Sequence, residues 1–385
     1  MRNTEFFWQE GHTLHEDKQE AQEFAQKIWQ EYQDYIEKDL CLAVIAGKKS
    51  EKEKFAGAVE SYTVECLLPD GLCLQLATSH YFGDNFCRAM NVKFQSKKQS
   101  KEEQLQYPFS TSWGTSTRAI GALALSHIDN LGLILPFGVA PVQIAFILGK
   151  ENEELISYYQ EVLDTFTNTK YRCQLYNQNK QVNLNILQAD KEGCPLKIIL
   201  GPEELEEGKI TLKRRDNIEN KITINIVAKS GFEAKFFPLF EDYAEKLNKI
   251  SLEEYKKNAI KPANIKEQMI EGVKRGHKQG KIFKAITQAR EELNKNLYQK
   301  SINFRDQHIF SVREYQELEK KIKGGAVGLF LIPFCNNLSC EETIPGKLPA
   351  YSIRCLSLTE KPEEGEKCIF CAFSTDNYAY LGRSY

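Results

Sequence analysis

The chain has 385 residues, 42% of them hydrophobic, which is enough for two or three domains that each bury a core. Its 51 Lys and Arg residues nearly balance its 53 Asp and Glu residues, and the net charge of −2 restricts any nucleic-acid-binding surface to a local patch. No apolar run approaches the roughly 20 residues that span a bilayer, and no apolar stretch follows the first residues as in a secretory signal, so we expect a cytoplasmic protein that does not enter membranes.

The first third of the chain predicts an antiparallel sheet with helices packed on it. Apolar residues recur near every 3.6 positions in 17–40, whereas apolar and polar residues alternate in 59–68. Pro69-Asp-Gly71 predicts a turn that joins this strand to the next one as a hairpin. Helices are predicted over 17–40, 83–90 and 117–127, and strands over 42–46, 59–68 and 72–77.

Strands and helices alternate after Pro136, which predicts a compact α/β domain of about a hundred residues. Its predicted elements are strands over 142–148, 196–200, 210–213 and 222–227 and a helix over 151–166. Residues 234–304 are predicted to be mostly helical, and the tail returns to strands, of which 326–332 is the clearest. Residues 251–305 hold 13 Lys and Arg against 6 Glu, and either a solvated helix face or contact with RNA phosphates explains this surplus.

The 11 cysteines fall into two groups. Seven lie among apolar neighbours and are interpreted as reduced core residues: Cys41, Cys66, Cys73, Cys87, Cys173, Cys194 and Cys355. The other four form a C-x4-C pair, Cys335 and Cys340, and a C-x2-C pair, Cys368 and Cys371, with 27 residues (341–367) between the pairs. Four thiolates in two close pairs suit a closed, tetrahedral zinc site that stabilises the tail. Disulfides are the alternative, which a reducing compartment disfavours.

Two segments have the composition of a ligand site. Phe6, Trp8 and Glu10 alternate along the chain, so on a strand they would place two rings and one carboxylate on the same face. Arg118 follows Thr-Ser-Trp-Gly-Thr-Ser-Thr and begins an apolar helix, where a fixed guanidinium suits a polyphosphate. The structural alternatives are ordinary core packing of the two rings and a buried pairing of Arg118 with an acid.

Four motifs follow one another along the chain: Arg2–His12, Glu51–Gly57, Gln75–His80 and Thr111–Arg118. Together they resemble prolyl-tRNA synthetase, a class II aminoacyl-tRNA synthetase, in the form that carries an extra C-terminal domain. The resemblance implies a multidomain protein of α/β and α+β type. It implies part of the class II antiparallel catalytic core at 1–138, an α/β anticodon-binding domain at 139–250, and a basic helical segment with a small zinc-binding α/β domain at 251–385. The implied activity is the ATP-dependent activation of L-proline and its transfer to tRNA-Pro.

The resemblance also implies roles for individual residues. Arg118 would hold the phosphates of ATP, and Gln75 would act beside it, close to Mg²⁺. Further contacts to the nucleotide would come from Arg2, Asn3, Thr78 and Ser116. The proline pocket would have Phe6 and Trp8 as its wall, with Glu10 orienting its neighbours and His80 on the far side.

Other implied features concern partners and the tail. Lys213, Arg214 and Arg215 would contact tRNA phosphates. The extra domain of the family often holds a zinc ion bound by four cysteines, which here match Cys335, Cys340, Cys368 and Cys371. The ending Gly382–Tyr385 is similar to that of members whose terminal Tyr packs back towards the catalytic domain, and the full-length enzyme is expected to be a homodimer.

The sequence departs from the family in two places. Motif 1, the Arg-x-Glu strand of motif 2 and the Thr-x-Glu loop have no counterpart, so we expect the C-terminal portion of a synthetase. Loss of one such arginine removes several kcal/mol of transition-state stabilisation, so the isolated chain is not expected to catalyse proline-dependent pyrophosphate exchange. Residues 176–186 lack the Pro-Gly and the Trp with which the family reads the anticodon. The alternatives are a non-catalytic, synthetase-derived module that binds tRNA or protein through 139–385, and an incomplete product without a stable fold.

Overall fold

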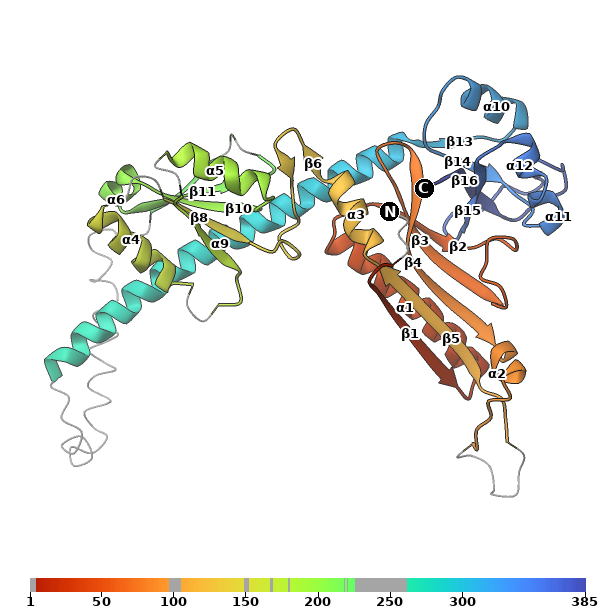
Figure 1. Cartoon of the computed structure of the whole chain (residues 1–385), viewed down its shortest axis with the longest axis horizontal. Coiled ribbons are helices and arrows are strands. Elements are labelled where there is room, and N and C mark those ends of the chain that lie inside the picture. The colour runs from red at the N-terminus through yellow and green to blue at the C-terminus, as the bar shows by residue number, and fades with distance from the viewer. Residues whose placement is uncertain are drawn as a thin grey trace. The chain divides into compact units, whose positions relative to one another are not determined.

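The computed structural model describes residues 5–96, 105–148, 152–166, 169–178, 181–217, 219, 221–225 and 262–385. In the last range, side chains are described from residue 278 onward. The chain divides into two compact units (Figure 1). The first unit combines Met1–Ile128 with Lys295–Tyr385, and the second is Asp129–Asn294. Two segments from opposite ends of the sequence therefore fold together in the first unit.

A nine-stranded sheet forms the centre of the first unit. Its strands are β1 (Trp8–His15), β2 (Val44–Lys48), β3 (Glu60–Leu67), β4 (Leu72–Gly83), β5 (Phe109–Ser116), β13 (Ile309–Ser311), β14 (Leu329–Pro333), β15 (Tyr351–Ser357) and β16 (Tyr378–Ser384). They lie in the order β1-β5-β4-β3-β2-β15-β16-β14-β13, and neighbours along this order are antiparallel except β13 and β14. The helices of this unit are α1 (Lys18–Lys38), α2 (Asn85–Ala89), α3 (Arg118–Ser126), α10 (Tyr315–Lys323), α11 (Leu338–Glu341) and α12 (Ile344–Lys347).

Helix α1 covers one face of the N-terminal strands. It begins after Asp17, whose carboxylate accepts hydrogen bonds from the N–H groups of Gln19 and Glu20 and so caps the helix. The Ser79 hydroxyl on β4 donates to the carbonyl oxygen of Ala25 at 2.7 Å, and the Trp29 indole N–H donates to the carbonyl oxygen of Thr63 on β3 at 2.9 Å. Because neighbouring residues of a strand point to opposite faces, Thr78 and His80 point away from α1.

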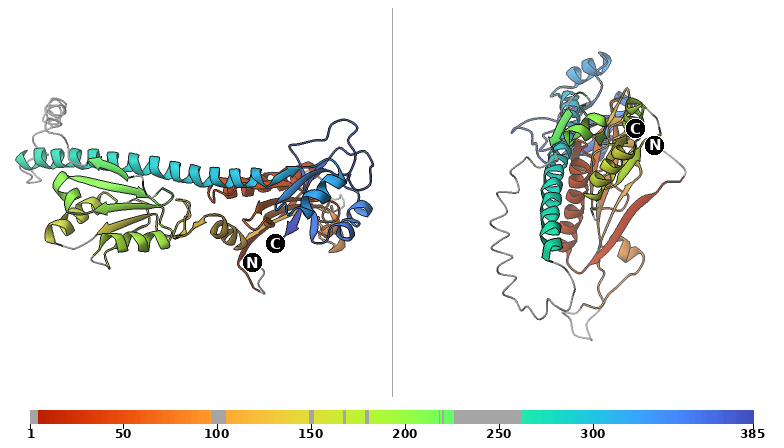
Figure 2. Two further views of the ribbon diagram at one scale, coloured as in Figure 1. Left: turned by 90° about the horizontal axis from the view of Figure 1, so that it is seen from above. Right: turned by 90° about the vertical axis from the view of Figure 1, so that its left-hand side faces the viewer.

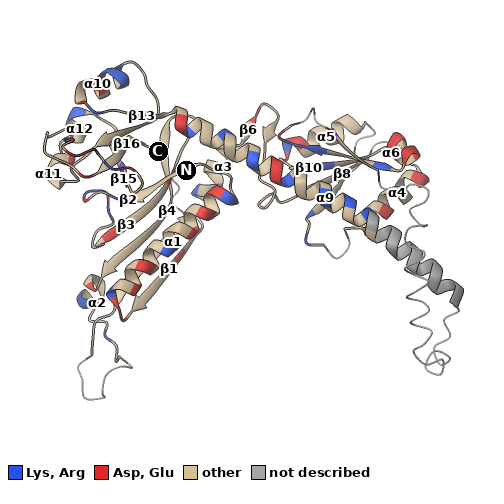
Figure 3. Ribbon diagram, turned by 180° about the vertical axis from the view of Figure 1, so that it is seen from behind, with Lys and Arg blue, Asp and Glu red and all other residues tan. Residues whose placement is uncertain are grey.

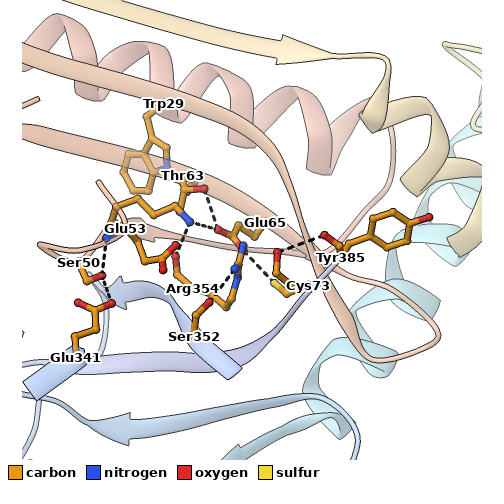
Figure 4. Close-up of polar contacts among 12 residues, drawn as sticks. Trp29, Ser50, Glu53, Thr63, Glu65, Cys73, Glu341, Ser352, Arg354 and Tyr385 are labelled. Atoms are coloured by element: carbon orange, nitrogen blue, oxygen red, sulfur yellow. Dashed lines mark hydrogen bonds and ion pairs between the residues drawn. The ribbon is translucent and has the colours of Figure 1, made fainter. Parts of the chain in front are cut away.

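The C-terminal strands extend the sheet that the N-terminal strands begin. Strand β15 pairs antiparallel with β2, and β16 pairs parallel with the start of β4. The terminal residue continues this pairing, since the N–H of Tyr385 donates to the carbonyl oxygen of Cys73 at 3.1 Å (Figure 4). The tail therefore packs back on the N-terminal segment, as the resemblance of its last residues implied.

The second unit has a five-stranded sheet with helices on both faces. Its strands are β8 (Ile144–Leu148), β9 (Cys173–Tyr176), β10 (Leu196–Leu200), β11 (Lys209–Arg214) and β12 (Lys221–Asn225), in the order β12-β11-β10-β8-β9. Its helices are α4 (Glu153–Asp164), α5 (Val182–Lys191), α6 (Pro202–Glu207) and the first part of α9 (Pro262–Gln307). The residues of α9 up to Asn294 belong to this unit. The short strands β6 (Ile128–Asp129) and β7 (Gly132–Leu133) follow α3 in the chain.

The two faces of this second sheet are covered by different helices. Strands β8 and β10 run parallel and are buried along their whole length, which is typical of α/β domains. Phe146 on β8 packs in a cluster with residues of α4 and with Ile282 and Ile286 of α9. Helix α9 runs along this sheet (Figure 2). Ala145 and Ile147, the next residues on the strand, pack in a second cluster that includes α5.

The predicted mixed fold class is confirmed, with differences at the element boundaries. Strand β4 runs to Gly83 rather than ending near residue 77, because its far end stays paired with both β3 and β5. Within the predicted helical stretch 234–304, residues 234–261 lie outside the described residues, and the described helix begins at Pro262. In the part of the chain that the structure describes, no helix combines the length and the apolarity needed to cross a membrane.

Candidate functional site

A single pocket in the first unit brings most of the predicted site residues together. It has a volume of about 680 Å³, within the range of small-molecule sites. Strands β1, β4 and β5, the start of α3 and the segment between β2 and β3 line it. Eight predicted residues lie on its wall: Phe6, Trp8, Glu10, Gln75, Thr78, His80, Ser116 and Arg118. Of the remaining predicted nucleotide contacts, Arg2 and Asn3 lie outside the described residues.

Strand β1 supplies the aromatic and acidic part of the pocket. Trp8, Glu10 and His12 alternate along it and all line the pocket. The rings of Phe6 and Trp8 meet edge to face with centroids 6.3 Å apart, and both side chains remain more than half exposed. Nε2 of His12, a pocket residue that sequence reasoning missed, lies 3.3 Å from Oε2 of Glu10.

A β-bulge in strand β4 brings Gln75 to the same wall as Thr78 and His80. Strict alternation would turn Gln75 to the opposite face, since it is three residues from Thr78. The register between β3 and β4 shifts by one between Val64 and Glu65, which leaves one extra residue in β4 and restores the facing. Gln75, Thr78 and His80 are accordingly the partly exposed residues of this stretch, between buried neighbours.

His80 is held as a neutral imidazole. Burial, and to a lesser degree the nearby Lys49 ammonium, lowers the pKa of His80 to about 4. Its Nδ1 lies 2.8 Å from the Ser61 hydroxyl, and its ring lies 5.1 Å from the ring of Phe55 between centroids. A neutral ring offers one N–H and one lone pair to a ligand and adds no positive charge to the pocket wall.

Arg118 is the first residue of α3 and lies in the pocket wall. Its backbone N–H donates to the Ser116 hydroxyl at 3.3 Å, while the N–H of Thr117 donates to the carbonyl oxygen of Phe7 at 3.0 Å, so the turn before the helix is fixed on both sides. Among the residues that the structure describes, no acid or other hydrogen-bond partner of its guanidinium is recorded. The described residues therefore do not show the structural alternative for Arg118, which was a buried ion pair with an acid.

The segment between β2 and β3 adds residues that sequence reasoning did not assign to the site. Lys49, Glu53 and Phe55 line the pocket. The Lys49 ammonium is buried and donates to Oε1 of Glu65 at 2.5 Å. The signal was available, because Glu51–Gly57 is one of the four motifs of the family resemblance, but the motif alone did not say which of its side chains face the ligand.

The three residues predicted to contact tRNA differ in their surroundings. Arg215 is buried and donates two hydrogen bonds to the Asp129 carboxylate, at 2.7 and 2.6 Å. Arg214 is also buried and pairs with Asp216 at 3.0 Å and with Glu292. These two guanidinium groups stabilise the second unit, so the prediction that they contact tRNA is revised; Lys213, which is only partly buried, remains a candidate.

The four cysteines predicted to bind metal form one cluster. The Sγ atoms of Cys335, Cys340, Cys368 and Cys371 all lie within 4.8 Å of one another, and all four are free thiols. The distances are 3.8 Å between Cys340 and Cys368 and 3.6 Å between Cys335 and Cys371. Zinc–sulfur bonds of about 2.3 Å in a tetrahedron separate the sulfurs by roughly 3.8 Å, so the cluster has the dimensions of a zinc site. Burial raises the pKa of the Cys340 thiol, so a bound cation would be needed to keep it deprotonated.

Comparison with known proteins gives a consistent result. A family model described as an anticodon binding domain matches residues 138–229, and one described as the C-terminal part of prolyl-tRNA synthetase matches residues 315–385. A proline--tRNA ligase of Mesoplasma florum is 35% identical over all of this chain, which covers 68% of that protein. The chain belongs to the prolyl-tRNA synthetase family. The family resemblance predicted from the motifs is thereby confirmed.

Solved structures agree with this assignment to the prolyl-tRNA synthetase family. Prolyl-tRNA synthetase of Cryptosporidium parvum, complexed with L-proline and AMP, superimposes with a TM-score of 0.78 at 28% identity, over 99% of this chain and 68% of that one. The same enzyme complexed with halofuginone and AMPPNP gives a TM-score of 0.78 at 27% identity, over 100% and 68% of the two chains. The chain thus corresponds to about two thirds of the length of these relatives.

Proposed function

We propose that the pocket of the first unit binds L-proline and ATP for the synthesis of prolyl-tRNA. The observation that carries this proposal is the shared wall of Arg118 and the strand with Trp8 and Glu10. The Arg118 guanidinium lies in one hollow with the rings of Phe6 and Trp8 and the carboxylate of Glu10. Among the described residues, no acid pairs with this guanidinium. This combination suits an anionic nucleotide together with a small cyclic amino acid.

Arg118 is proposed to neutralise the phosphates of ATP. In the activation step a carboxylate oxygen of proline bonds to the α-phosphorus, and the bond to the β,γ-pyrophosphate breaks. Charge moves on the phosphate oxygens during this exchange, so a guanidinium fixed at the start of a helix stabilises the transition state without moving. Thr78 and Ser116 offer hydroxyl groups on the same wall, and Mg²⁺ accompanying ATP would lie near Gln75.

Proline is proposed to lie against Trp8 and Phe6, with its ammonium near Glu10. The ring of proline is apolar and small, so an aromatic wall removes it from water without needing hydrogen bonds there. The neutral imidazole of His80 limits the positive charge on the pocket wall where the ammonium binds. The relative solved in complex with L-proline and AMP supports the proposal of these two classes of ligand, an amino acid and an adenine nucleotide.

The second unit is proposed to bind the anticodon part of tRNA-Pro, which the match to an anticodon binding domain supports. Lys213 on β11 lies directly opposite Lys221 on β12. Burial lowers the pKa of Lys213, and the positive charge of Lys221 lowers it further. Two adjacent ammonium groups attract a phosphate. The described part of α9 carries residues of both charges (Figure 3). Between residues 276 and 307 it has seven Lys or Arg residues and three Asp or Glu residues.

The cysteine cluster is proposed to hold one structural zinc ion, and the enzyme is proposed to work as a cytoplasmic homodimer. All four cluster thiols occupy ligand positions, so zinc would have no open position for catalysis. The 11 cysteines of the chain are free thiols, which agrees with a reducing compartment.

Calorimetric titration of the purified chain with L-proline and with ATP tests the proposal. Arg118→Ala should weaken ATP binding by about 10- to 100-fold, the value of a charge-assisted contact, and leave proline binding within about twofold. Trp8→Ala should weaken proline binding by about tenfold because apolar area is lost. The matched controls are Arg88→Ala, an exposed arginine on α2, and Phe7→Ala, an exposed ring next to Trp8; neither residue lines the pocket.

The results distinguish the proposed catalytic function from the non-catalytic alternative. If Arg118→Ala and Arg88→Ala weaken ATP binding equally, the proposed role of Arg118 is refuted. No binding of either ligand, combined with tight binding of tRNA-Pro, would instead favour the non-catalytic module.

A further inference from the structure

The pocket loop, defined here as Lys49–Gly57, is anchored by residues of the C-terminal segment. The loop carries Lys49, Glu53 and Phe55 into the pocket wall. Its middle and end are mostly exposed, whereas Lys49 and Ser50 at its start are buried. The position of the pocket side chains therefore depends on what holds the start of the loop.

The first anchor is a buried charge cluster. Glu65 on β3 accepts from the Lys49 ammonium at 2.5 Å and from Nε of Arg354 on β15 at 2.8 Å (Figure 4). The Lys49 ammonium also donates to the carbonyl oxygen of Arg354 at 2.9 Å. All three side chains are at least nine-tenths buried, so their positions are fixed by charge pairing away from water.

The second anchor comes from the region of the cysteine cluster. The hydroxyl of Ser50 donates to Oε1 of Glu341 at 2.6 Å, in a contact where both residues are buried. The backbone N–H of Glu51 donates to Oδ1 of Asn336 at 3.2 Å. Asn336 lies between Cys335 and Cys340 and Glu341 directly follows Cys340, so the fold around the cysteines sets where these two acceptors stand.

Contacts within the pocket loop connect Ser50 to the side chains that line the pocket. The N–H of Glu53 lies 3.4 Å from the Ser50 hydroxyl, and the N–H of Lys54 donates to the carbonyl oxygen of Ser50 at 3.0 Å, so Ser50 begins the turn that carries Glu53. Phe55 then packs its ring on His80 and donates its N–H to the Ser61 hydroxyl at 3.1 Å.

We infer that Glu341 and Asn336 are positioning residues for the substrate pocket, acting through Ser50 and Glu51 on the pocket loop. The cysteine-cluster region then has a role in substrate affinity although none of its cysteines lines the pocket. The predicted effect on affinity rests on the proposed function, whereas the predicted effect on the loop does not.

Amide hydrogen exchange of residues 51–57 and the Kd for L-proline, measured on the whole chain, test this inference. Glu341→Ala and Ser50→Ala should each accelerate exchange in the loop and raise the Kd by about three- to thirty-fold. Because the two residues act through one contact, the double variant should add little to either effect. Glu341→Gln keeps an oxygen that accepts from Ser50 and should stay close to wild type. Glu342→Ala, at the exposed neighbouring residue, is the matched control.

A second variant guards against simple loss of folding. Asn336 has a φ of 55°, a conformation that glycine adopts freely, so Asn336→Gly removes only the acceptor for Glu51. It should accelerate exchange in 51–57 while residues 329–332 of β14 exchange as in wild type. The inference is overturned if exchange in the loop is unchanged in Glu341→Ala and Asn336→Gly, or if Glu342→Ala has an equal effect. Failure of the wild-type chain to bind L-proline would refute the proposed function, and the exchange comparison would still decide the role of the two residues.

Discussion

Two arginines in this chain show that the partner of a guanidinium decides its role. Arg215 is buried and makes a two-pronged contact with Asp129, so its charge is neutralised inside the second unit. Arg118 lies in a pocket wall, and among the described residues no acid is recorded next to it. A guanidinium that already has a buried carboxylate gains little from binding a phosphate, whereas one without such a partner gains a charge-assisted contact.

His80 should make stability depend on pH in a defined window. The folded protein keeps its pKa at about 4, below the ordinary value of 6.5, so between these values the unfolded chain binds more protons than the folded one. The stabilisation is complete above pH 6.5 and is lost as the pH falls towards 4. Urea unfolding at pH 7 and pH 4.5 should show wild type losing on the order of 2 kcal/mol more than His80→Gln. An equal loss in both proteins would show that the imidazole is not held neutral.

Glu65 should be the critical member of the buried charge cluster. Glu65→Gln leaves the Lys49 and Arg354 charges buried without the carboxylate they share, which should lower the free energy of unfolding by about 3–5 kcal/mol. Arg354→Met leaves the Lys49–Glu65 pair intact and should cost clearly less, as measured by urea unfolding at pH 7. The two positive neighbours lower the pKa of Glu65 to about 2 against the effect of burial, so its stabilisation is present above pH 4.5 and lost as the pH falls towards 2. A larger loss in Arg354→Met than in Glu65→Gln would contradict this order.

At the scale of elements, strands β1 and β5 meet closely because one residue is glycine. Gly11 lies opposite Trp113, and a Cβ at Gly11 would come within 2.3 Å of the indole ring. The indole in turn packs on Phe24 of α1, with ring centroids 5.4 Å apart. The ring is thus confined from both sides, and the pocket face of β1 depends on this fit.

Gly11→Ala should therefore lower the free energy of unfolding by about 1–3 kcal/mol, the usual cost of overpacking. Gly346→Ala is the matched control in the same unit, since a Cβ there meets no atom within 4 Å, and it should change stability by less than about 0.5 kcal/mol. Thermal unfolding of both variants measures the difference. Equal stability of the two variants would mean that β1 and β5 can move apart to accept the added methyl group without a loss of folding free energy.

At the scale of the whole molecule, the cysteine cluster ties two segments of the C-terminal tail together. Cys340 and Cys368 belong to the same buried cluster as residues of β14, β15 and β16. Purified chain should contain about one equivalent of zinc, and a chelator or Cys340→Ser should lower the melting temperature of the first unit, because metal binding stabilises only the folded state. The transition of the second unit should not change. Less than about a third of an equivalent of zinc, with no effect of chelator on melting, would count against a structural metal site.

The local elements were predictable because they depend on residues close together in the chain. Leu196–Leu200 has the bounds predicted from its apolar run, and the helix from Lys18 to Lys38 matches its 3.6-residue period. The alternation of Trp8 and Glu10 also predicted which face they share, since a strand has a period of two. The extra residue in β4 was not predictable, because a bulge arises from pairing between strands rather than from the sequence of one strand.

The sequence by itself determined the family, many of the helices and strands, and two motifs with the composition of a ligand site, because motif spacing and periodicity are carried by neighbouring residues. Only the tertiary structure decided that β15 and β16 extend the sheet begun by β2 and β4, and that Glu341 contacts Ser50. It also decided that Arg214 and Arg215 are occupied by acids, whereas Arg118 faces the pocket. These outcomes depend on which residues far apart in the chain come into contact, and burial then fixes the partner of each charge because an unpaired charge in the interior is costly.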